Sequence, residues 1–337
     1  MTALALSDRR PVARTLGALG ALLAVGATCL ELVQIAAPYG FPFWAWVVAT
    51  VTGLVLVWGG LNAIRQDLGA RVVAAVLAVG VVLMIVVPFG FVVVLGAFQR
   101  RIDLLTGPHV IPPAPTMIAL QQLLQNPYFE TGLRNSLVVS TTAAIVTTLL
   151  GLLGAYAIAR LRFPGRGASY TAVMIAYMLP GIAILVPLVA IFKGIGLIDT
   201  LPGMIVGHVA MAVPLVTWIL IGTFDGLEPD LEHAARIDGA SRIQALRRVV
   251  LPVTVPSIVT AAVFGFVLSW NDLLISKVLY VSSTPMLAPS IVNLMDPLNR
   301  IEPQLSMAGL VASIPVLTLA LIMQKYLIKG LGEGAVK

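Results

Sequence analysis

The chain has 337 residues, of which 59% are hydrophobic and 11% are charged, and its mean hydropathy is +0.99. A soluble domain carries about 25% charged residues, so this composition excludes an ordinary soluble protein and predicts an integral membrane protein. The net charge of +6 does not indicate a nucleic-acid partner, because no long basic block is present and the positive residues fall mainly between apolar runs.

Eight apolar segments are long enough to cross a bilayer, for which a helix needs about 20 residues. In chain order they are 15–38, 41–62, 72–97, 136–158, 168–191, 203–223, 253–275 and 305–324. The first exceeds the apolar part of a signal peptide, about 7–15 residues, and a second follows almost at once, so we expect a retained helix. The expected fold class is an all-α membrane protein with about eight transmembrane helices.

The Lys and Arg residues predict the orientation. With the N-terminus in the cytoplasm, 15 of the 21 lie on the inner side, which the positive-inside rule favours. These are Arg9, Arg10, Arg14, Arg65, Arg71, Arg160, Arg162, Arg166, Arg236, Arg242, Arg247, Arg248, Lys325, Lys329 and Lys337. Because the number of spans is even, both termini are expected in the cytoplasm, and residues 98–135 form an external loop.

Three prolines, Pro180, Pro187 and Pro214, fall inside expected spans. Proline removes a backbone hydrogen bond from a helix, and in a bilayer the freed carbonyl needs another partner. We therefore expect kinks at these positions, buried against other helices.

Residues 225–252 form the only long charged stretch expected on the inner side, and they read as two short helices. Pro229 suits a first helical position and Gly239 suits the left-handed residue that ends a helix. Ser241, with Gln244 three residues later, predicts a capping box at the start of the second helix.

Leu231, Ala234 and Ala235 share one face of the first short helix, with i, i+3 and i+4 spacing. This small apolar patch could fit a groove on a soluble partner. The alternative from the residues alone is an amphipathic helix that lies on the membrane surface.

The segment 225–252 resembles the EAA loop of ABC-importer permeases: Glu-Ala-Ala, three residues, Gly, nine residues, an aliphatic residue, one residue, then Leu-Pro. The spacing matches without a gap, at Ala234, Ala235, Asp238, Gly239, Val249, Leu251 and Pro252. The departure is His233, which stands where the family has the glutamate, although Glu232 precedes it. Because Glu232 lies about 100° around the helix from His233, it is an imperfect substitute.

The resemblance implies that this loop docks in a cleft of a separate ATPase and couples its closure to the membrane helices. The implied coupling residues are Leu231, Glu232, His233, Ala234, Ala235, Asp238, Gly239, Leu251 and Pro252. It also implies a second homologous permease, two ATPase subunits that bind ATP and Mg, and an extracytoplasmic solute-binding protein, in a bacterial inner or plasma membrane. No cofactor is expected in this chain.

Further short matches resemble the carbohydrate branch, of the maltose and glycerol-phosphate transporter type. They are Asn135-Ser136, residues 155–166, residues 178–180 and Trp270-Asn271. The resemblance covers residues 72–337, a core of six spans, and leaves residues 1–71, with two spans, as an addition. It implies import of a sugar or sugar-like solute; a permease for a polyamine, peptide or phosphonate is the alternative.

Trp270, Asn271 and Asp272 are expected near the path of the solute, where an indole can stack on a sugar ring and an amide can bond its hydroxyls. An interfacial aromatic anchor with polar neighbours is the equally open alternative.

The chain contains no Gly-Lys dipeptide and hence no P-loop, and its three histidines, His109, His208 and His233, lack the spacing of metal ligands. We expect no catalytic residue and no metal site. The rivals are an ion-driven secondary transporter, expected to carry intramembrane acids and inverted repeats, and an integral-membrane enzyme.

Overall fold

The computed structural model describes residues 89–100, 102–103, 112–295 and 302–334. The predicted spans 15–38 and 41–62, most of the span 72–97 and the boundary at residue 71 lie outside these residues. The chain divides into two units, Met1–Gly90 and Phe91–Lys337, and the following description concerns the second.

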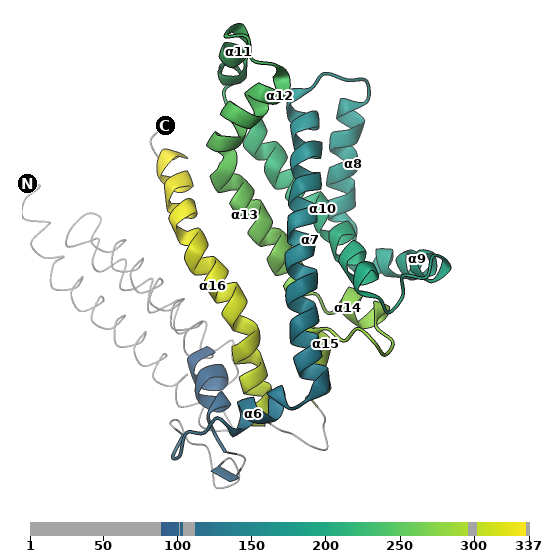
Figure 1. The fold of residues 1–337 in the computed structure, drawn as a ribbon, viewed down its shortest axis with the longest axis vertical. Helices are drawn as coiled ribbons and strands as arrows, with labels where there is room; N and C mark the ends of the chain where they lie inside the picture. Colours follow the sequence, from purple (N-terminus) through teal and green to yellow (C-terminus); the bar gives the residue numbers. More distant parts are fainter. Residues whose placement is uncertain (1–88, 101, 104–111, 296–301, 335–337) are drawn as a thin grey trace, which may run out of the picture. The chain divides into compact units, whose positions relative to one another are not determined.

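All regular structure in the described ranges is helical (Figure 1). The elements are η1 (Phe89–Leu95), α6 (Ile118–Leu124), α7 (Pro127–Arg160), α8 (Arg166–Met178), α9 (Gly181–Gly194), α10 (Leu201–Asp225), α11 (Pro229–Ile237), α12 (Arg242–Ala245), η2 (Leu246–Val250), α13 (Leu251–Trp270), α14 (Leu274–Leu279), α15 (Leu287–Asn293) and α16 (Glu302–Gly334), where η denotes a π-helix. An all-helical membrane fold is thus confirmed for this part of the chain.

Among the described residues, four helices are long and apolar enough to cross a membrane. They are α7, α10, the continuous helix from α12 to α13 at Arg242–Trp270, and Pro303–Gln324 of α16. They agree with the predicted spans 136–158, 203–223 and 305–324, whereas the predicted span 253–275 extends beyond its helix, which ends at Trp270. At about 1.5 Å per residue, the 34 residues of α7 extend for about 51 Å, well beyond a hydrocarbon layer of about 30 Å.

The predicted span 168–191 is instead a bent pair. Its helices, α8 and α9, meet at an angle of 99°. Pro180 explains the break, because it lacks an N–H group and disfavours the helical conformation at the preceding residue. Leu179 is accordingly extended, with ψ of 131°. This corrects the prediction of one continuous span and confirms the kink at Pro180, while Pro187 and Pro214 lie inside α9 and α10.

Helix α7 packs against both α10 and α13 through small residues. Ala143 and Ala155 on α7 are fully buried. A Cβ added to Gly151 would lie 3.0 Å from Cγ1 of Val216 on α10, so only glycine lets the two backbones approach this closely. Small residues drive close helix packing in lipid, where apolar burial gives little net gain.

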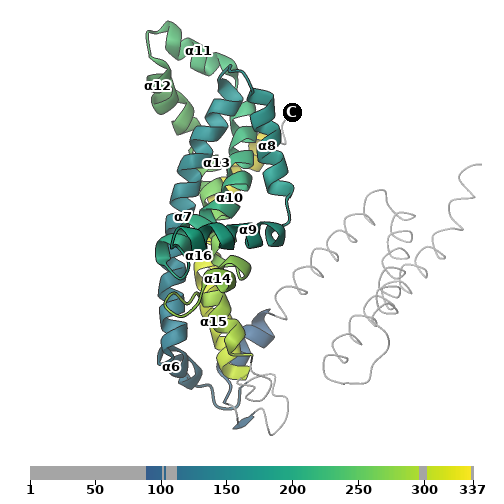
Figure 2. The same ribbon diagram turned by 90° about the vertical axis from the view of Figure 1, so that its right-hand side faces the viewer.

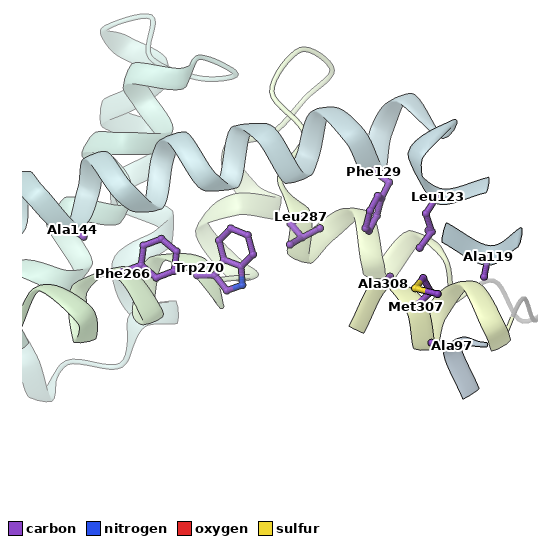
Figure 3. Packing of buried hydrophobic residues seen from close by; sticks show 10 residues of the cluster. All are labelled: Ala97, Ala119, Leu123, Phe129, Ala144, Phe266, Trp270, Leu287, Met307 and Ala308. Carbon is purple, nitrogen blue, oxygen red and sulfur yellow. The ribbon is translucent and has the colours of Figure 1, made fainter. Parts of the chain in front are cut away.

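A second set of contacts connects α13 with α16 (Figure 3). Trp270 is 3% exposed, and its ring stacks on Phe266 with a centroid distance of 5.6 Å and an interplanar angle of 15°. The indole Nε1 donates a hydrogen bond to the carbonyl oxygen of Ala312, at 3.0 Å. Trp270 is therefore satisfied within its own chain on both its face and its polar edge.

At the end of this unit opposite α11, α7 holds the chain that leads into α15 (Figure 1). The Asn135 amide donates to the carbonyl oxygen of Pro285 at 2.9 Å, and the backbone N–H of Leu287 donates to the Ser136 hydroxyl at 2.8 Å. Both polar residues are buried, so the pair noted in the sequence has a structural role: it ties residues 285–287 to α7.

Asp199 organises the segment between α14 and α15. Its carboxylate accepts hydrogen bonds from the backbone N–H groups of residues 281–284 at 2.8–3.2 Å, and its own φ is +57°. Burial alone would raise the pKa of Asp199, but the hydrogen bonds from Ser283, Ser282, Val281 and the Thr284 hydroxyl outweigh burial and hold that pKa well below the usual carboxyl range. The charged carboxylate is thus the form that holds this segment.

We predict that Asp199→Asn lowers the thermal stability of the detergent-purified protein at neutral pH by a few degrees in Tm, since about 1 kcal/mol corresponds to about 2–4 °C in a chain of this size. Because the folded pKa is depressed, the carboxylate contributes its full stability above the unfolded pKa of about 3.9 and loses it as pH falls towards the folded pKa. The Tm difference should therefore shrink below about pH 4.

The control is Asp225→Asn, at an exposed aspartate at the end of α10, which should leave Tm unchanged. Equal Tm values for Asp199→Asn and wild type at pH 7 would contradict this role.

Candidate functional site

The predicted two-helix segment is present at one end of the unit, where α11 and α12 lie beyond the end of α7 (Figures 1 and 2). Pro229 occupies the first turn of α11, as expected. Gly239 has φ of +89°, its N–H donates to the carbonyl of Arg236, and the N–H of Ala240 donates to that of Ala235. This is the Schellman arrangement, and it confirms the helix end predicted at Gly239.

The capping box is also confirmed. The Ser241 backbone N–H donates to Gln244 Oε1 at 2.8 Å, and the Gln244 N–H donates to Ser241 Oγ at 3.3 Å. The sharp turn between α11 and α12 is therefore encoded locally, by a glycine and a reciprocal cap that begins two residues after it.

An apolar surface covers the exposed side of this segment. Leu231 is 43% exposed, Ala234 is exposed and Ala235 is half-buried. Two further aliphatic residues that the sequence reasoning missed, Ile237 at 84% and Ile243 at 68%, are exposed beside the turn. Their signal was an aliphatic side chain at a position flanked by charged or polar residues. We call these five residues the docking face.

Glu232 and His233 have different environments. The Tyr156 hydroxyl on α7 donates to Glu232 Oε1 at 2.9 Å, so Glu232 turns towards its own chain. His233 is exposed, with Nδ1 3.9 Å from Asp230 Oδ1 on the same helix. Glu232, which precedes the glutamate position of the EAA pattern, is thus bound within its own chain, whereas the His233 side chain is exposed to solvent.

Arg160 holds the chain that leads into α11. Its Nη2 donates to the carbonyl oxygens of Phe224 and Leu227, each at 2.7 Å. Together with Glu232 and Val253, it lines a small pocket between α11 and α13. The sequence reasoning used Arg160 only for orientation and for the family-like stretch 155–166, and it did not predict this contact.

The remaining predicted coupling residues frame the segment. Asp238 caps the C-terminus of α11 and is exposed. Leu251 and Pro252 begin α13 directly after the π-helix η2, inside the continuous helix Arg242–Trp270, where the proline has no N–H to donate. These residues therefore mark where α12, through η2, continues into α13, which ends at Trp270.

Of the three residues expected on the solute path, Trp270 is enclosed by Phe266 and α16, as described above. Asn271 caps α13 and is exposed. Asp272 Oδ2 accepts a hydrogen bond from the Ser276 N–H at 3.1 Å and lies 4.0 Å from His208 Nε2. A role on the solute path stays a prediction for Asn271 and Asp272, and for Trp270 it would require the ring to leave Phe266.

His208 is the centre of a buried polar junction between α10, α13 and α14. Its Nδ1 lies 2.8 Å from Ser269 Oγ, and its Nε2 lies 3.3 Å from Ser276 Oγ. The sequence reasoning considered His208 only as a metal ligand; the described residues contain no group of three or more His, Cys, Asp or Glu side chains that could hold a metal ion. The partners of His208 lie 61 and 68 residues away in sequence, so no local pattern reveals them.

Comparison with known proteins identifies the class. The chain belongs to the family described as the binding-protein-dependent transport system inner membrane component, whose model matches residues 147–333. It is 36% identical over 231 residues to the trehalose transport system permease protein SugB of Mycobacterium tuberculosis, a match that covers 68% of this chain and 84% of that protein.

A longer match, 27% identical over 277 residues, is to the trehalose/maltose transport system permease protein MalG of Thermococcus litoralis, and it covers 81% of this chain and 99% of that protein. The fold resembles the crystal structure of a bacterial ABC transporter involved in alginate import, with a TM-score of 0.67 and 21% identity, over 78% of this chain and 98% of that one. The chain is therefore an inner-membrane permease component, a transport subunit rather than an enzyme.

We predict that His208→Leu destabilises the protein, because it leaves the buried hydroxyls of Ser269 and Ser276 without this partner, at about 1–3 kcal/mol for an unsatisfied buried group. The measurement is Tm in detergent. Ser269→Ala, which removes one of the hydrogen bonds, should lower Tm by less. A Tm for His208→Leu equal to that of wild type would refute the structural role of the junction.

Proposed function

We propose that this chain is the transmembrane permease subunit of an ATP-driven ABC importer for a sugar or sugar-like solute, coupled to its ATPase through residues 225–252. The observation that carries the proposal is the exposed apolar docking face on α11 and α12, next to residues that follow the EAA spacing and a turn set by the positive φ of Gly239. An exposed aliphatic surface on a short charged segment is costly in water and is typical of a partner-binding helix.

A carbohydrate cargo is supported by the relatives, which carry the names of trehalose and maltose systems. This support favours a sugar over the polyamine, peptide and phosphonate alternatives. We propose that Asn271 and Asp272, just beyond the end of α13, contribute polar groups to the solute path.

The complete importer, in this proposal, contains a second homologous permease, two ATPase subunits that bind ATP and Mg, and an external solute-binding protein. The family's dependence on a binding protein supports the last of these. Residues 72–337 form the core that works with these partners, and residues 1–71 are an addition to it.

In this proposal α11 lies on the cytoplasmic side. Arg160, Arg162 and Arg166 lie at the same end of the chain's helices, as the positive-inside rule favours. The C-terminal end of α16 reaches this end of the unit in Figure 1, which supports a cytoplasmic C-terminus.

The test is purification of the tagged complex from its own host, followed by native mass measurement. We expect an ATPase and a second permease to copurify, and sugar-loaded binding protein to stimulate ATP hydrolysis. Ion-coupled uptake by this chain alone in liposomes would overturn the proposal.

We predict that Gly239→Val abolishes most solute-stimulated ATP hydrolysis and uptake. No atom lies within 4 Å of a Cβ at this position, so the cost is backbone strain at φ of +89°, about 1–3 kcal/mol, rather than a clash. That strain should tilt the docking face while insertion and recognition of loaded binding protein persist. The assay is ATPase activity and uptake of the purified complex in lipid.

The control is Gly222→Ala, at an exposed glycine of α10 with equally open space but ordinary helical φ, which should behave as wild type. Normal stimulation and uptake in Gly239→Val would remove the physical basis for assigning residues 228–252 as the coupling element.

A further inference from the structure

The contact between Glu232 and Tyr156 joins α11 to a helix that is not its neighbour in the chain. The two residues are 76 positions apart, and the hydroxyl-to-carboxylate distance is 2.9 Å. Helix α11 is connected covalently to α10 before it and to α12 and α13 after it, whereas α7 meets it only through side chains. Movement of α11 can therefore reach α7 indirectly, through α10 and α13 that pack on it, or directly, through contacts of this kind.

Packing holds the Tyr156 ring in a fixed position. Its side chain is 8% exposed and packs edge-to-face on Phe224, with ring centroids 5.8 Å apart and an interplanar angle of 80°. Both rings belong to the apolar cluster at the inner end of α7, α10 and α13. Because packing fixes the ring, the position of the hydroxyl oxygen is fixed, and Glu232 accepts its hydrogen bond.

Arg160 reinforces the same connection one helical turn further along α7. Its two hydrogen bonds to the carbonyls of Phe224 and Leu227 hold the end of α10 and the residues before α11. Tyr156 thus holds the docking helix itself, and Arg160 holds the chain that leads to it. With both contacts in place, α11 cannot shift without displacing α7 or breaking a charge-assisted hydrogen bond.

At its other end, α7 holds the segment that leads into α15. The bonds from Asn135 and Ser136 to residues 285–287 are continued by Ser290, whose hydroxyl donates to the carbonyl oxygen of Tyr128 at 3.0 Å. One unbroken helix of 34 residues therefore carries contacts to the docking helix at one end and to the opposite face of the unit at the other.

We propose that Tyr156 and Glu232 are positioning residues that make α7 follow the docking helix, so that ATPase closure and the outer segment 285–290 move together. The inference rests on the proposed function of α11 as the ATPase-docking helix. It assigns Glu232 an action through Tyr156 within the permease, and not a direct ion pair with the ATPase.

The test compares Tyr156→Phe, Glu232→Gln, Glu232→Ala and the double variant Tyr156→Phe/Glu232→Ala in the purified importer complex in proteoliposomes. The readouts are copurified ATPase, basal ATP hydrolysis, and solute taken up per ATP hydrolysed with loaded binding protein. Tyr156→Phe keeps the ring on Phe224 and removes only the hydroxyl. The matched control is Tyr170→Phe, at an exposed tyrosine of α8.

We expect Tyr156→Phe to retain the ATPase and basal hydrolysis. Tyr156→Phe and Glu232→Ala should each lower uptake per ATP by about three- to tenfold, the effect of losing one hydrogen bond. The double variant should be no worse than either single variant, because both remove the same interaction. Glu232→Gln, which keeps an acceptor oxygen for Tyr156, should restore part of the coupling. Tyr170→Phe should match wild type.

Two results would overturn the inference while leaving the proposed function intact. One is normal uptake per ATP in Tyr156→Phe. The other is equal impairment of Glu232→Gln and Glu232→Ala with additive effects in the double variant, which would place Glu232 in a charge contact with the ATPase. If Tyr156→Phe fails to assemble, the ranking of the two Glu232 variants decides. Absence of an ATPase from the wild-type complex would instead refute the proposed function.

Discussion

Backbone hydrogen bonding in an apolar solvent is the constraint on which the rest of this structure depends. A lipid-exposed carbonyl or N–H without a partner is costly, so the chain crosses the membrane as long helices and turns sharply at their ends. The Schellman turn at Gly239 lies at the end of the unit, outside the long helices. Within α7, Thr148 returns its hydroxyl to the carbonyl of Ala144 at 2.7 Å, so a polar side chain is accommodated without a partner from another helix.

The same constraint gives α7 its position. A long helix satisfied by its own backbone can place small residues against two neighbours and reserve a few polar side chains for specific contacts. In α7 these are Asn135 and Ser136 towards one end, and Tyr156 and Arg160 towards the other. Packing in the middle and hydrogen bonds at the ends make it the element that connects the docking face with the opposite side of the unit.

The features that could be predicted from the sequence are those that local chemistry encodes. The length of the apolar segments predicted the spans of α7, α10, α13 and α16. Turn chemistry predicted the helix end at Gly239 and the cap at Ser241. Hydropathy indicates how long an apolar segment is, but not how the helix axis is directed. It therefore predicted the bent pair α8 and α9 as one span, although Pro180 marked the place of the bend.

Contacts between residues distant in sequence could not be predicted from local sequence patterns. The partners of Tyr156 and His208 lie 76 and 61 residues away, and nothing in their immediate neighbours specifies them. Trp270 shows the same difficulty: an indole beside Asn271 and Asp272 is compatible with a solute path, but its ring is enclosed by Phe266 and its Nε1 is bonded to α16. Tertiary packing, which the sequence pattern does not report, sets the surroundings of this ring.

The break at Pro180 has a consequence for how the bilayer can surround this unit. Figures 1 and 2 show α9 at the level of the middle part of α7 rather than at its end, and Met178 at the break is 79% exposed. The last carbonyls of α8 lack helical donors there, and hydrocarbon tails supply none. Lipid therefore cannot cover the side of the unit where α8 ends without leaving these carbonyls unpaired, which is costly. This side is therefore suited to contact with water or with another protein.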